Sequence, residues 1–212
     1  MRDPPMTRKP EAVTPPRWQA IDLPGADVRF APDWLSRAEA DALFAELVDA
    51  IAWERHRIRI FGREVASPRL SCWIGDPGAA YTYSSVRFEP RPWPPALAAL
   101  RARVEAACGA VFNGVLANLY RDGADSMGWH SDDEPELGPA PVIASLSLGA
   151  ARRFRLRHKR DAAIMRVLEL PHGSLLRMAG ATQRLYRHDL PKTRGAVGPR
   201  LNLTFRRILT PS

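Results

Sequence analysis

The sequence predicts an α+β fold, in which an antiparallel double sheet carries helices on one side. Two segments with apolar residues at helical spacing come first, and many short apolar or alternating segments follow them. Glycine and proline separate the short segments, as is typical of turns between strands. The 212 residues are 45% hydrophobic, which is enough to enclose one core and excludes disordered and collagen-like chains. One large domain with an appended tail is therefore expected.

The helices are predicted to follow a proline-rich segment. Six of the 20 prolines lie among residues 1–25, which we expect to form an extended, poorly ordered arm. A first helix should begin at Ser36, because a glutamate three residues later completes a capping box, and its apolar spacing continues to about Trp53. A second helix should follow Pro95 and end at Gly109, since glycine is favoured just beyond a helix C-terminus.

Beyond Gly109 the apolar pattern changes from helical spacing to short strand-like segments. Glycine and proline lie between these segments, so each is predicted to be a strand of the double sheet. The strands are expected at residues 115–121, 141–148, 153–158, 165–170, 174–178 and 200–208.

Charge and cysteine content narrow the functional classes. Lys and Arg number 31 and Asp and Glu 23, so the net charge of +8 favours a polyanionic partner, although a merely cationic protein would show the same balance. Two cysteines are too few for a zinc ribbon, an iron–sulfur cluster or a disulfide framework, and they indicate a reducing compartment. No apolar stretch reaches the ~20 residues of a membrane span. We expect a soluble protein of the bacterial cytoplasm, or of the nucleus if the source is eukaryotic.

A pair of polar residues, His130 and Asp132, is a candidate for metal binding. In an extended backbone, residues two apart face the same way, so both side chains can approach one ion. His188, far along the chain, would complete a set of two histidines and one carboxylate, which is the ligand set of non-haem ferrous oxygenases. Taken alone, the His-x-Asp pair is more simply a solvated surface pair.

The last predicted strand strengthens the metal hypothesis. Apolar and polar residues alternate along residues 200–206, so four polar side chains share one face: Arg200, Asn202, Thr204 and Arg206. This face could be an ordinary solvated one. If it lines the interior, two buried guanidinium groups would need an anion, which a dicarboxylate cosubstrate would supply. Asn118 and Tyr120, also two residues apart, could bind the same ligand.

Together these segments are similar to AlkB-type dioxygenases, which depend on ferrous iron and 2-oxoglutarate. The resemblance covers residues 58–209 and rests on Asn118-Leu119-Tyr120, on His130-Ser131-Asp132-Asp133-Glu134, on His188 and on the alternating strand from Arg200 to Arg206. The double-strand-DNA repair branch, of the AlkB homologue 2 type, is the branch that the sequence resembles most. Its traits reappear in Ile60-Phe61-Gly62, Pro68-Arg69, Tyr81-Thr82-Tyr83-Ser84, Ile143-Ala144-Ser145, Arg157-His158-Lys159 and His172-Gly173-Ser174-Leu175-Leu176.

The resemblance implies a double-stranded β-helix, or jelly roll, with N-terminal supporting helices and a nucleotide-recognition lid. The dioxygenase domain would span residues 26–212, with the lid at about 54–91 and the jelly-roll core at about 110–209. It also implies that His130, Asp132 and His188 hold Fe(II). The residues implied to bind 2-oxoglutarate are Asn118, Tyr120, Arg200, Asn202, Thr204 and Arg206.

The implied reaction is the oxidative demethylation of 1-methyladenine and 3-methylcytosine in alkylated, double-stranded DNA. It consumes O2 and 2-oxoglutarate and releases formaldehyde, succinate and CO2. Because a methylated base edge lies inside the duplex, the nucleotide must be flipped out of the stack. Phe61 is the candidate wedge for the gap, with a buried hairpin aromatic as the equal alternative.

Further substrate contacts are implied by matching positions. Tyr83, where the family more often has phenylalanine, could stack on the flipped base opposite His130. Asp133 is a candidate catalytic residue that would accept a hydrogen bond from an exocyclic amine, or else is only a solvated neighbour of the metal site. The other substrate positions implied are Tyr81, Ser84 and Glu134.

A basic segment, residues 152–160, holds six Lys or Arg among nine residues. Arginines alternate there with Phe154 and Leu156, so one face of the strand should be cationic. Such a run is usually a solvated face, but beside a base-flipping site it is interpreted as a phosphate track that includes Arg157, with Arg69 as a second contact. The connection after Arg160 is shorter than the basic loop of the repair branch at this position. In that branch the loop holds the complementary DNA strand, so this chain departs from the branch in that contact.

Three alternatives stay open at this point. The same iron core could serve an RNA or tRNA demethylase, or a small-molecule hydroxylase. The chain could also be a non-catalytic module that binds damaged DNA, although the intact ligand set and the arginine pair argue against it. A monomer is expected.

Overall fold

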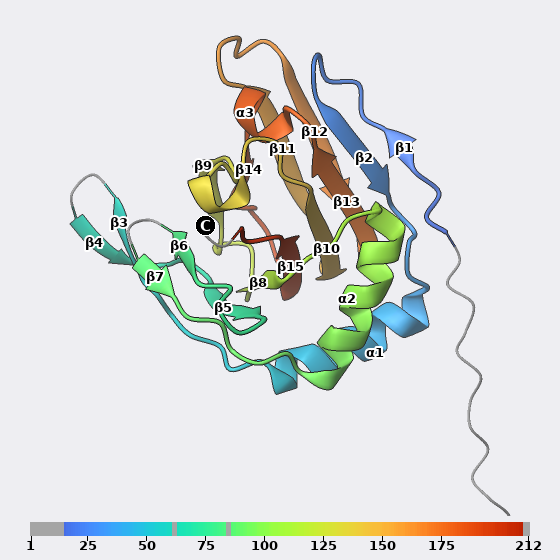
Figure 1. Ribbon diagram of the computed structural model, residues 1–212, viewed down its shortest axis with the longest axis vertical. Helices are drawn as coiled ribbons and strands as arrows, with labels where there is room; N and C mark the ends of the chain where they lie inside the picture. The colour runs from blue at the N-terminus through green and yellow to red at the C-terminus, as the bar shows by residue number, and fades with distance from the viewer. Residues whose placement is uncertain (1–14, 61–62, 84–85, 210–212) are drawn as a thin grey trace, which may run out of the picture.

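The computed structural model describes residues 15–60, 63–83 and 86–209, and in the strands between residues 57 and 65 and between 81 and 87 it describes the backbone alone. Two antiparallel sheets form a jelly-roll core (Figure 1), which confirms the predicted fold class. The larger sheet has seven strands, in the order β1 (Gln19–Ala20), β2 (Asp27–Ala31), β13 (Ser174–Ala179), β10 (Ile143–Gly149), β15 (Arg200–Arg206), β8 (Gly114–Tyr120) and β5 (Leu70–Gly75).

The smaller sheet has four strands and packs against the larger one. Its order is β12 (Met165–Leu170), β11 (Arg152–His158), β14 (Tyr186–Leu190) and β9 (Met127–His130). Apolar side chains fill the space between the sheets, including Leu116, Phe154, Leu156, Leu176 and Tyr186. Two further antiparallel pairs stand apart from both sheets, β3 (Arg57–Ile60) with β4 (Arg63–Ala66) and β6 (Tyr81–Tyr83) with β7 (Val86–Phe88).

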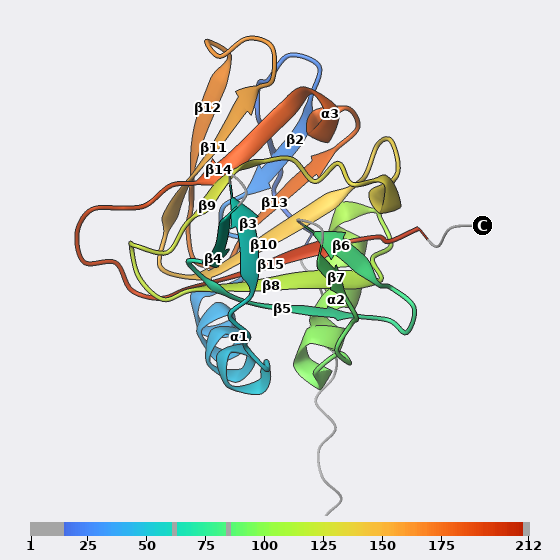
Figure 2. The same cartoon turned by 90° about the vertical axis from the view of Figure 1, so that its left-hand side faces the viewer.

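Two helices cover the outer face of the larger sheet. Figure 2 shows α1 (Arg37–Ala50) and α2 (Pro95–Cys108) on the side of that sheet away from the smaller one. Leu47 of α1 and Leu100 of α2 belong to one buried cluster with Leu201 and Leu203 of β15. The apolar residues of β15 therefore face the helices, and its polar residues face the smaller sheet.

The helix termini follow the local signals in the sequence. Ser36 caps α1 by accepting a hydrogen bond from the backbone N–H of Glu39, and Gly109 ends α2 in the left-handed region with φ 62°. The expected extension of the first helix to Trp53 is wrong. Ile51 is extended, with ψ 129°, and the indole of Trp53 donates back to the carbonyl of Val48 at 2.8 Å.

The prediction of a poorly ordered arm over residues 1–25 is wrong for its C-terminal part. β1 pairs with β2 through Gln19 and Phe30, and Leu23 is buried, because this edge strand packs onto the sheet that holds β13. Residues 1–14 lie outside the described residues. The predicted strands after Gly109 are confirmed as β8, β10, β11, β12, β13 and β15.

The six predicted strands leave out β1 to β7, β9 and β14. In β5 the last five of six residues are buried, so its sequence does not alternate between apolar and polar types. β9 has only four residues, too few for a clear periodicity.

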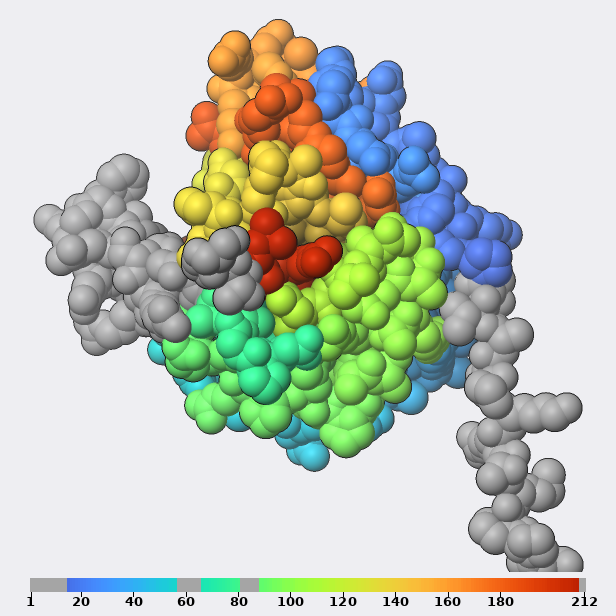
Figure 3. Space-filling view, in the orientation of Figure 1, coloured from blue at the N-terminus to red at the C-terminus, as the bar shows by residue number. Residues whose placement is uncertain are grey.

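Two short helices and the C-terminal segment complete the chain. The 3₁₀ turn η1 (Pro135–Leu137) follows β9, and α3 (Thr182–Leu185) precedes β14. Beyond β15, the backbone N–H of Leu209 donates to the carbonyl of Glu136 at 2.8 Å, and in Figure 3 the red C-terminal segment is exposed between the yellow residues after β9 and the green α2. No helix within the described residues has the length and apolar character to cross a bilayer.

Candidate active site

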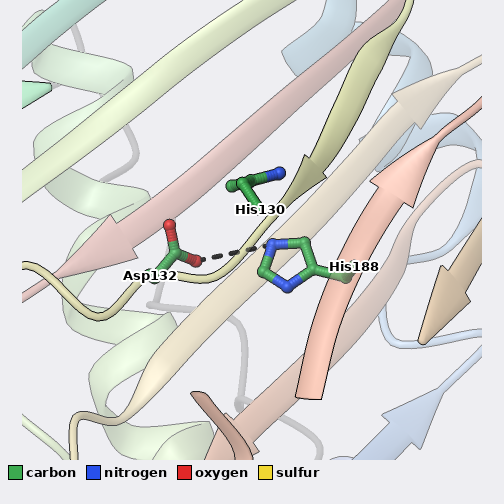
Figure 4. A group of neighbouring side chains, drawn as sticks. All are labelled: His130, Asp132 and His188. Carbon is green, nitrogen blue, oxygen red and sulfur yellow. Dashed lines mark ion pairs between the residues drawn. The ribbon is translucent and has the colours of Figure 1, made fainter. Parts of the chain in front are cut away.

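Three side chains converge where β9 and β14 pair in the smaller sheet. His130 ends β9 and lies opposite His188 of β14 in the strand register, and Asp132 follows two residues after β9. Their candidate ligand atoms all lie within 4.8 Å of one another, and Nε2 of His188 is 3.7 Å from Oδ2 of Asp132 (Figure 4). The structure therefore brings together the three residues that the sequence proposed as one metal site.

Backbone groups orient this cluster. Nδ1 of His130 lies 2.8 Å from the carbonyl oxygen of Gly128, which can only accept, so Nδ1 carries the proton and Nε2 keeps its lone pair. A β-bulge makes this contact possible, because Gly128 and Trp129 together lie opposite Asp189 alone.

The segment after β9 is tied to α3 and to the start of β14 by two hydrogen bonds. The backbone N–H of Asp132 donates to Oε1 of Gln183 at 3.0 Å, and the hydroxyl of Ser131 donates to the carbonyl of Tyr186 at 2.9 Å. Gln183 was not predicted from the sequence, which offers no spacing signal for it. These bonds hold the carboxylate of Asp132 close to the histidines without using its side-chain oxygens.

The electrostatics favour the metal-binding protonation states. Burial lowers the pKa of His130 and lowers the pKa of His188 to about 3, so both rings are neutral at physiological pH. Burial alone would raise the pKa of Asp132, but the charge and hydrogen bond of Arg206 together with the two histidines outweigh it and hold that pKa at about 2. Arg206 also lowers the pKa of both histidines. Two neutral imidazoles and a carboxylate are a donor set that fits Fe(II).

A cavity between the two sheets opens beside the cluster. It is lined by His130, Asp132 and His188 and by apolar groups such as Phe154 and Met178. All six residues predicted to bind 2-oxoglutarate also line it: Asn118, Tyr120, Arg200, Asn202, Thr204 and Arg206. The alternation of β15 therefore does turn its polar face into the interior.

The two arginines lie at different parts of this cavity wall. Both are 2% exposed, and Arg206 donates to Oδ1 of Asp132. Arg200 donates to the hydroxyl of Ser147 at 2.8 Å, and no carboxylate of the described residues lies within ion-pairing distance of it. Burial lowers the pKa of Arg200 to about 10. A buried cation without a fixed anion suits a ligand that carries a carboxylate.

Comparison with known proteins accounts for this site. The family model described as the 2OG-Fe(II) oxygenase superfamily matches residues 27–206. The chain belongs to the AlkB family of these oxygenases. It is 41% identical to the DNA oxidative demethylase ALKBH2 of Homo sapiens over 205 residues, which cover 92% of this chain and 78% of that protein.

Other relatives agree with this assignment. The alkB homolog 3 dioxygenase of Bos taurus is 40% identical over 190 residues, covering 85% of this chain and 66% of that protein. The solved structure of OsALKBH1, at 16% identity, superposes with a TM-score of 0.65 over 90% of this chain and 99% of that one, which supports the fold. The chain is thus an AlkB-family oxidative demethylase that uses Fe(II) and 2-oxoglutarate.

Two of the arginines expected at the surface of this AlkB-family enzyme lie inside it. Arg69 was predicted to contact phosphate, but it is 5% exposed and its Nε donates to Oδ1 of Asn118 at 2.7 Å. That contact places Arg69 behind the cofactor residues and not on a phosphate track. Arg152, the first residue of the predicted basic segment, is 2% exposed. Sequence reasoning missed both because charged residues are rarely buried.

The remaining predicted substrate residues are placed only in part. Phe61 and Ser84 lie outside the described residues, and only the backbone of Tyr81 and Tyr83 is described, in β6. Asp133 is exposed, and its Oδ2 accepts from Nζ of Lys159 at 2.8 Å. Glu134 is partly buried. Arg157, on the outward face of β11, has its guanidinium carbon 4.4 Å from the centre of the Trp129 ring.

Proposed function

We propose that this dioxygenase repairs double-stranded DNA by demethylating N-alkylated bases such as 1-methyladenine and 3-methylcytosine. The observation that carries the choice of DNA is the 41% identity, over 92% of the chain, to a protein named a DNA oxidative demethylase. A net charge of +8 supports a polyanionic substrate.

In this proposal His130, Asp132 and His188 hold Fe(II). Arg206, which already contacts Asp132, binds the carboxylate of 2-oxoglutarate that lies near the metal, and Arg200 binds the distal carboxylate. When bound, iron and 2-oxoglutarate together with O2 supply the oxidation of the N-methyl group, and the products are formaldehyde, succinate, CO2 and the restored base.

Polar side chains on β8 and β15 keep the remaining wall of the 2-oxoglutarate site in place. Nδ2 of Asn202 donates to the hydroxyl of Ser145 at 2.8 Å, and the hydroxyl of Thr204 donates to Oδ1 of Asn202 at 2.9 Å. On the facing strand, Asn118 is held by Arg69. Because these partners are fixed before the ligand arrives, little reorganisation is needed on binding.

Residues around the opening of the cavity would read the flipped base. Tyr83 would stack on the base opposite His130, and Phe61 would fill the gap in the duplex, within a lid at residues 54–91. Extruding a base costs a few kcal/mol, and least for a lesion that already disrupts pairing. Tyr81, Ser84 and Glu134 would contribute further polar contacts to the base or its sugar.

Asp133 would act as the hydrogen-bond acceptor for the exocyclic amine of adenine or cytosine. One of its carboxylate oxygens is engaged by Lys159, so the other is available to a base. Lys159 also donates to the carbonyl of Gln183 at 2.8 Å, which fixes the direction from which it approaches Asp133.

The outward face of β11 would track the DNA backbone. Arg153 is exposed, and Arg155 and Arg157 are partly exposed on the same face. Both of the latter guanidinium groups lie over Trp129, at 4.9 and 4.4 Å from its ring centre. Arg155 is already paired with the carboxylate of Asp189, so Arg153 and Arg157 would make the phosphate contacts.

The decisive experiment compares formaldehyde release from methylated duplex DNA, methylated single-stranded DNA and methylated RNA of one sequence. The purified protein is first reconstituted anaerobically with Fe(II) and 2-oxoglutarate, and O2 is then admitted. Preference for the duplex supports the proposal, and equal turnover of all three rejects the duplex claim. Asp132→Ala should abolish formaldehyde release and leave nucleic-acid binding largely intact, since Asp132 is 1% exposed and cannot contact the backbone.

A second measurement tests the wedge. Phe61→Ala should reduce activity on duplex DNA far more than on single-stranded DNA, because only the duplex leaves a gap to be filled. Parallel losses on the two substrates would assign Phe61 to the fold alone.

A further inference from the structure

Arg152, the first residue of β11, is a buried cation that the reaction described above does not use. It is 2% exposed, and among the described residues no carboxylate lies within ion-pairing distance of its guanidinium group. Its partners are backbone carbonyls instead: Nη1 donates to Asp122 at 3.0 Å, and Nη2 donates to Asp125 and to Pro191, each at 2.8 Å. One side chain therefore ties the turn after β8 to the segment after β14.

Tyr120, a residue of the proposed 2-oxoglutarate site, lies close to both Arg152 and Arg200. The guanidinium carbon of Arg152 is 5.8 Å from the centre of the Tyr120 ring, and that of Arg200 is 5.3 Å from the same centre. Tyr120 is itself 2% exposed and lines the cavity, and its hydroxyl donates to the sulfur of Met127 at 3.8 Å. The ring is thus fixed by two cations and a thioether at the end of the cavity that holds Arg200.

The charge of Arg152 acts on Arg200. Burial first, and then the charge of Arg152, lower the pKa of Arg200 to about 10, although Tyr120 partly compensates. Burial also lowers the pKa of Arg152. Two positive charges without a carboxylate in a poorly solvated region are unfavourable, and an anion in the adjoining cavity would offset the cost for both.

We propose that Arg152 is a positioning residue that makes the cosubstrate site selective for 2-oxo diacids. It holds Tyr120 in place beside Arg200 and adds a second positive charge behind the distal carboxylate of 2-oxoglutarate. A 2-oxo monoacid, which has no distal carboxylate, gains nothing from this charge. The inference rests on the assignment of Arg200 to the distal carboxylate in the proposed function.

The neighbouring residue provides a matched control. Arg153 follows Arg152 in the same strand, carries the same charge and is exposed on the opposite face. Arg152→Met and Arg153→Met therefore remove equal charge from positions that differ only in burial and contacts.

The test measures ligand binding to protein loaded with Mn(II), without nucleic acid and without turnover. Calorimetric titration with 2-oxoglutarate, and competition with 2-oxovalerate, which has five carbons but one carboxylate, yield two dissociation constants. Arg152→Met should weaken the binding of 2-oxoglutarate roughly tenfold. This is the effect expected when a charge about 10 Å from the distal carboxylate is removed at an effective dielectric constant of about 20. The affinity for 2-oxovalerate should stay within about twofold, and Arg153→Met should leave both constants unchanged.

An equal loss of affinity for the two ligands, or an unchanged affinity for 2-oxoglutarate, would overturn the proposal. A residue with a purely structural role would affect the binding of both ligands alike. If Arg152→Met does not fold, Arg152→Lys retains the charge but cannot reach three carbonyls, and it should reduce the preference for 2-oxoglutarate by about threefold. Failure of both variants to fold would assign Arg152 to the fold alone.

The outcome is independent of the nucleic-acid substrate, since no DNA is present. Arg200→Met tests the remaining premise, which is that Arg200 binds the distal carboxylate of 2-oxoglutarate. If that variant keeps full affinity for 2-oxoglutarate, the assignment of Arg200 fails, whereas a loss in Arg200→Met without a loss in Arg152→Met rejects only the role of Arg152.

Discussion

Strands β15 and β11 both alternate polar with apolar residues and both carry arginines on the polar face, yet the structure uses the arginines of these two faces in opposite ways. In β15, Arg200 and Arg206 are 2% exposed and face the cavity. In β11, Arg153 is exposed, and Arg155 and Arg157 are partly exposed on the outer face of the smaller sheet. The same local pattern therefore produces an anion site in one sheet and a cationic surface in the other.

The difference comes from what covers each face. The apolar face of β15 is covered by α1 and α2, so its polar face must look toward the smaller sheet. The apolar residues of β11, Phe154 and Leu156, pack into the space between the sheets, so the arginines between and after them look outward, and only Arg152, on the apolar face, is buried. An arginine turned inward acts through direct contacts in a low dielectric, whereas one turned outward acts through a screened field.

The largest expected effect comes from Arg206→Met, the change closest to the metal site. Removing this cation takes away the main influence that lowers the pKa of Asp132, and the pKa values of His130 and His188 rise as well. Higher pKa values mean that protons compete with the metal at higher pH, so binding should be lost at a higher pH than in the wild type. Breaking the buried pair should also lower the free energy of unfolding by about 3–5 kcal/mol, and the pH at which Mn(II) binding is half lost should rise.

Electron paramagnetic resonance of Mn(II) between pH 5.5 and pH 8 would measure this shift. Arg207→Met is the control, because Arg207 is the exposed neighbour of Arg206 and its charge is screened by water. A pH profile that coincides with that of the wild type would break the claim that Arg206 sets the protonation of the three ligands.

Arg200→Met should act on the cosubstrate and not on the metal. Removing one partner of a buried charge pair costs about 2–5 kcal/mol, so kcat/KM for 2-oxoglutarate should fall roughly 100-fold or more. Mn(II) affinity should be unchanged, since Arg200 contacts Ser147 and Tyr120 and not the metal ligands. A parallel fall in Mn(II) affinity would contradict this division of labour between the two arginines of β15.

A smaller and different effect is expected from Arg157→Ala on the outer face of β11. If Arg157 neutralises one phosphate, the slope of log affinity for DNA against log salt should become shallower by about 0.9. Binding should weaken several-fold on all sequences alike, while affinity for 2-oxoglutarate stays constant. Fluorescence anisotropy over a range of salt concentrations measures the slope, and an unchanged slope would remove Arg157 from the phosphate track.

The smallest effect on the folded protein is expected from Arg153→Ala. Because Arg153 is exposed, the free energy of unfolding should change by no more than about 0.5 kcal/mol. Urea denaturation measures it, with Phe154→Ala as the contrast, which should cost about 3–5 kcal/mol as a buried aromatic. A large loss in Arg153→Ala would show that the outer face of β11 is not merely solvated.

The sequence was sufficient to predict the site residues and helix ends that depend on a short repeat or on a local capping signal. The two-residue period placed His130 and Asp132 on one side and turned Arg200, Asn202 and Thr204 to a common face. Capping signals at Ser36 and Gly109 located one end of each long helix. By contrast, the end of α1 and the course of residues 15–25 depended on distant packing, and both were predicted wrongly.

By itself, then, the sequence determined the two long helices, six of the strands, the chemistry of the site and the family, because side-chain type and short spacings express these directly. Only the tertiary structure decided which arginines are buried. Arg69 and Arg152 lie inside because strands from distant parts of the chain close over them and offer a side-chain amide and three backbone carbonyls as acceptors. Such burial depends on hydrogen-bond partners far along the chain, so the alternation of residue types within one strand does not predict it.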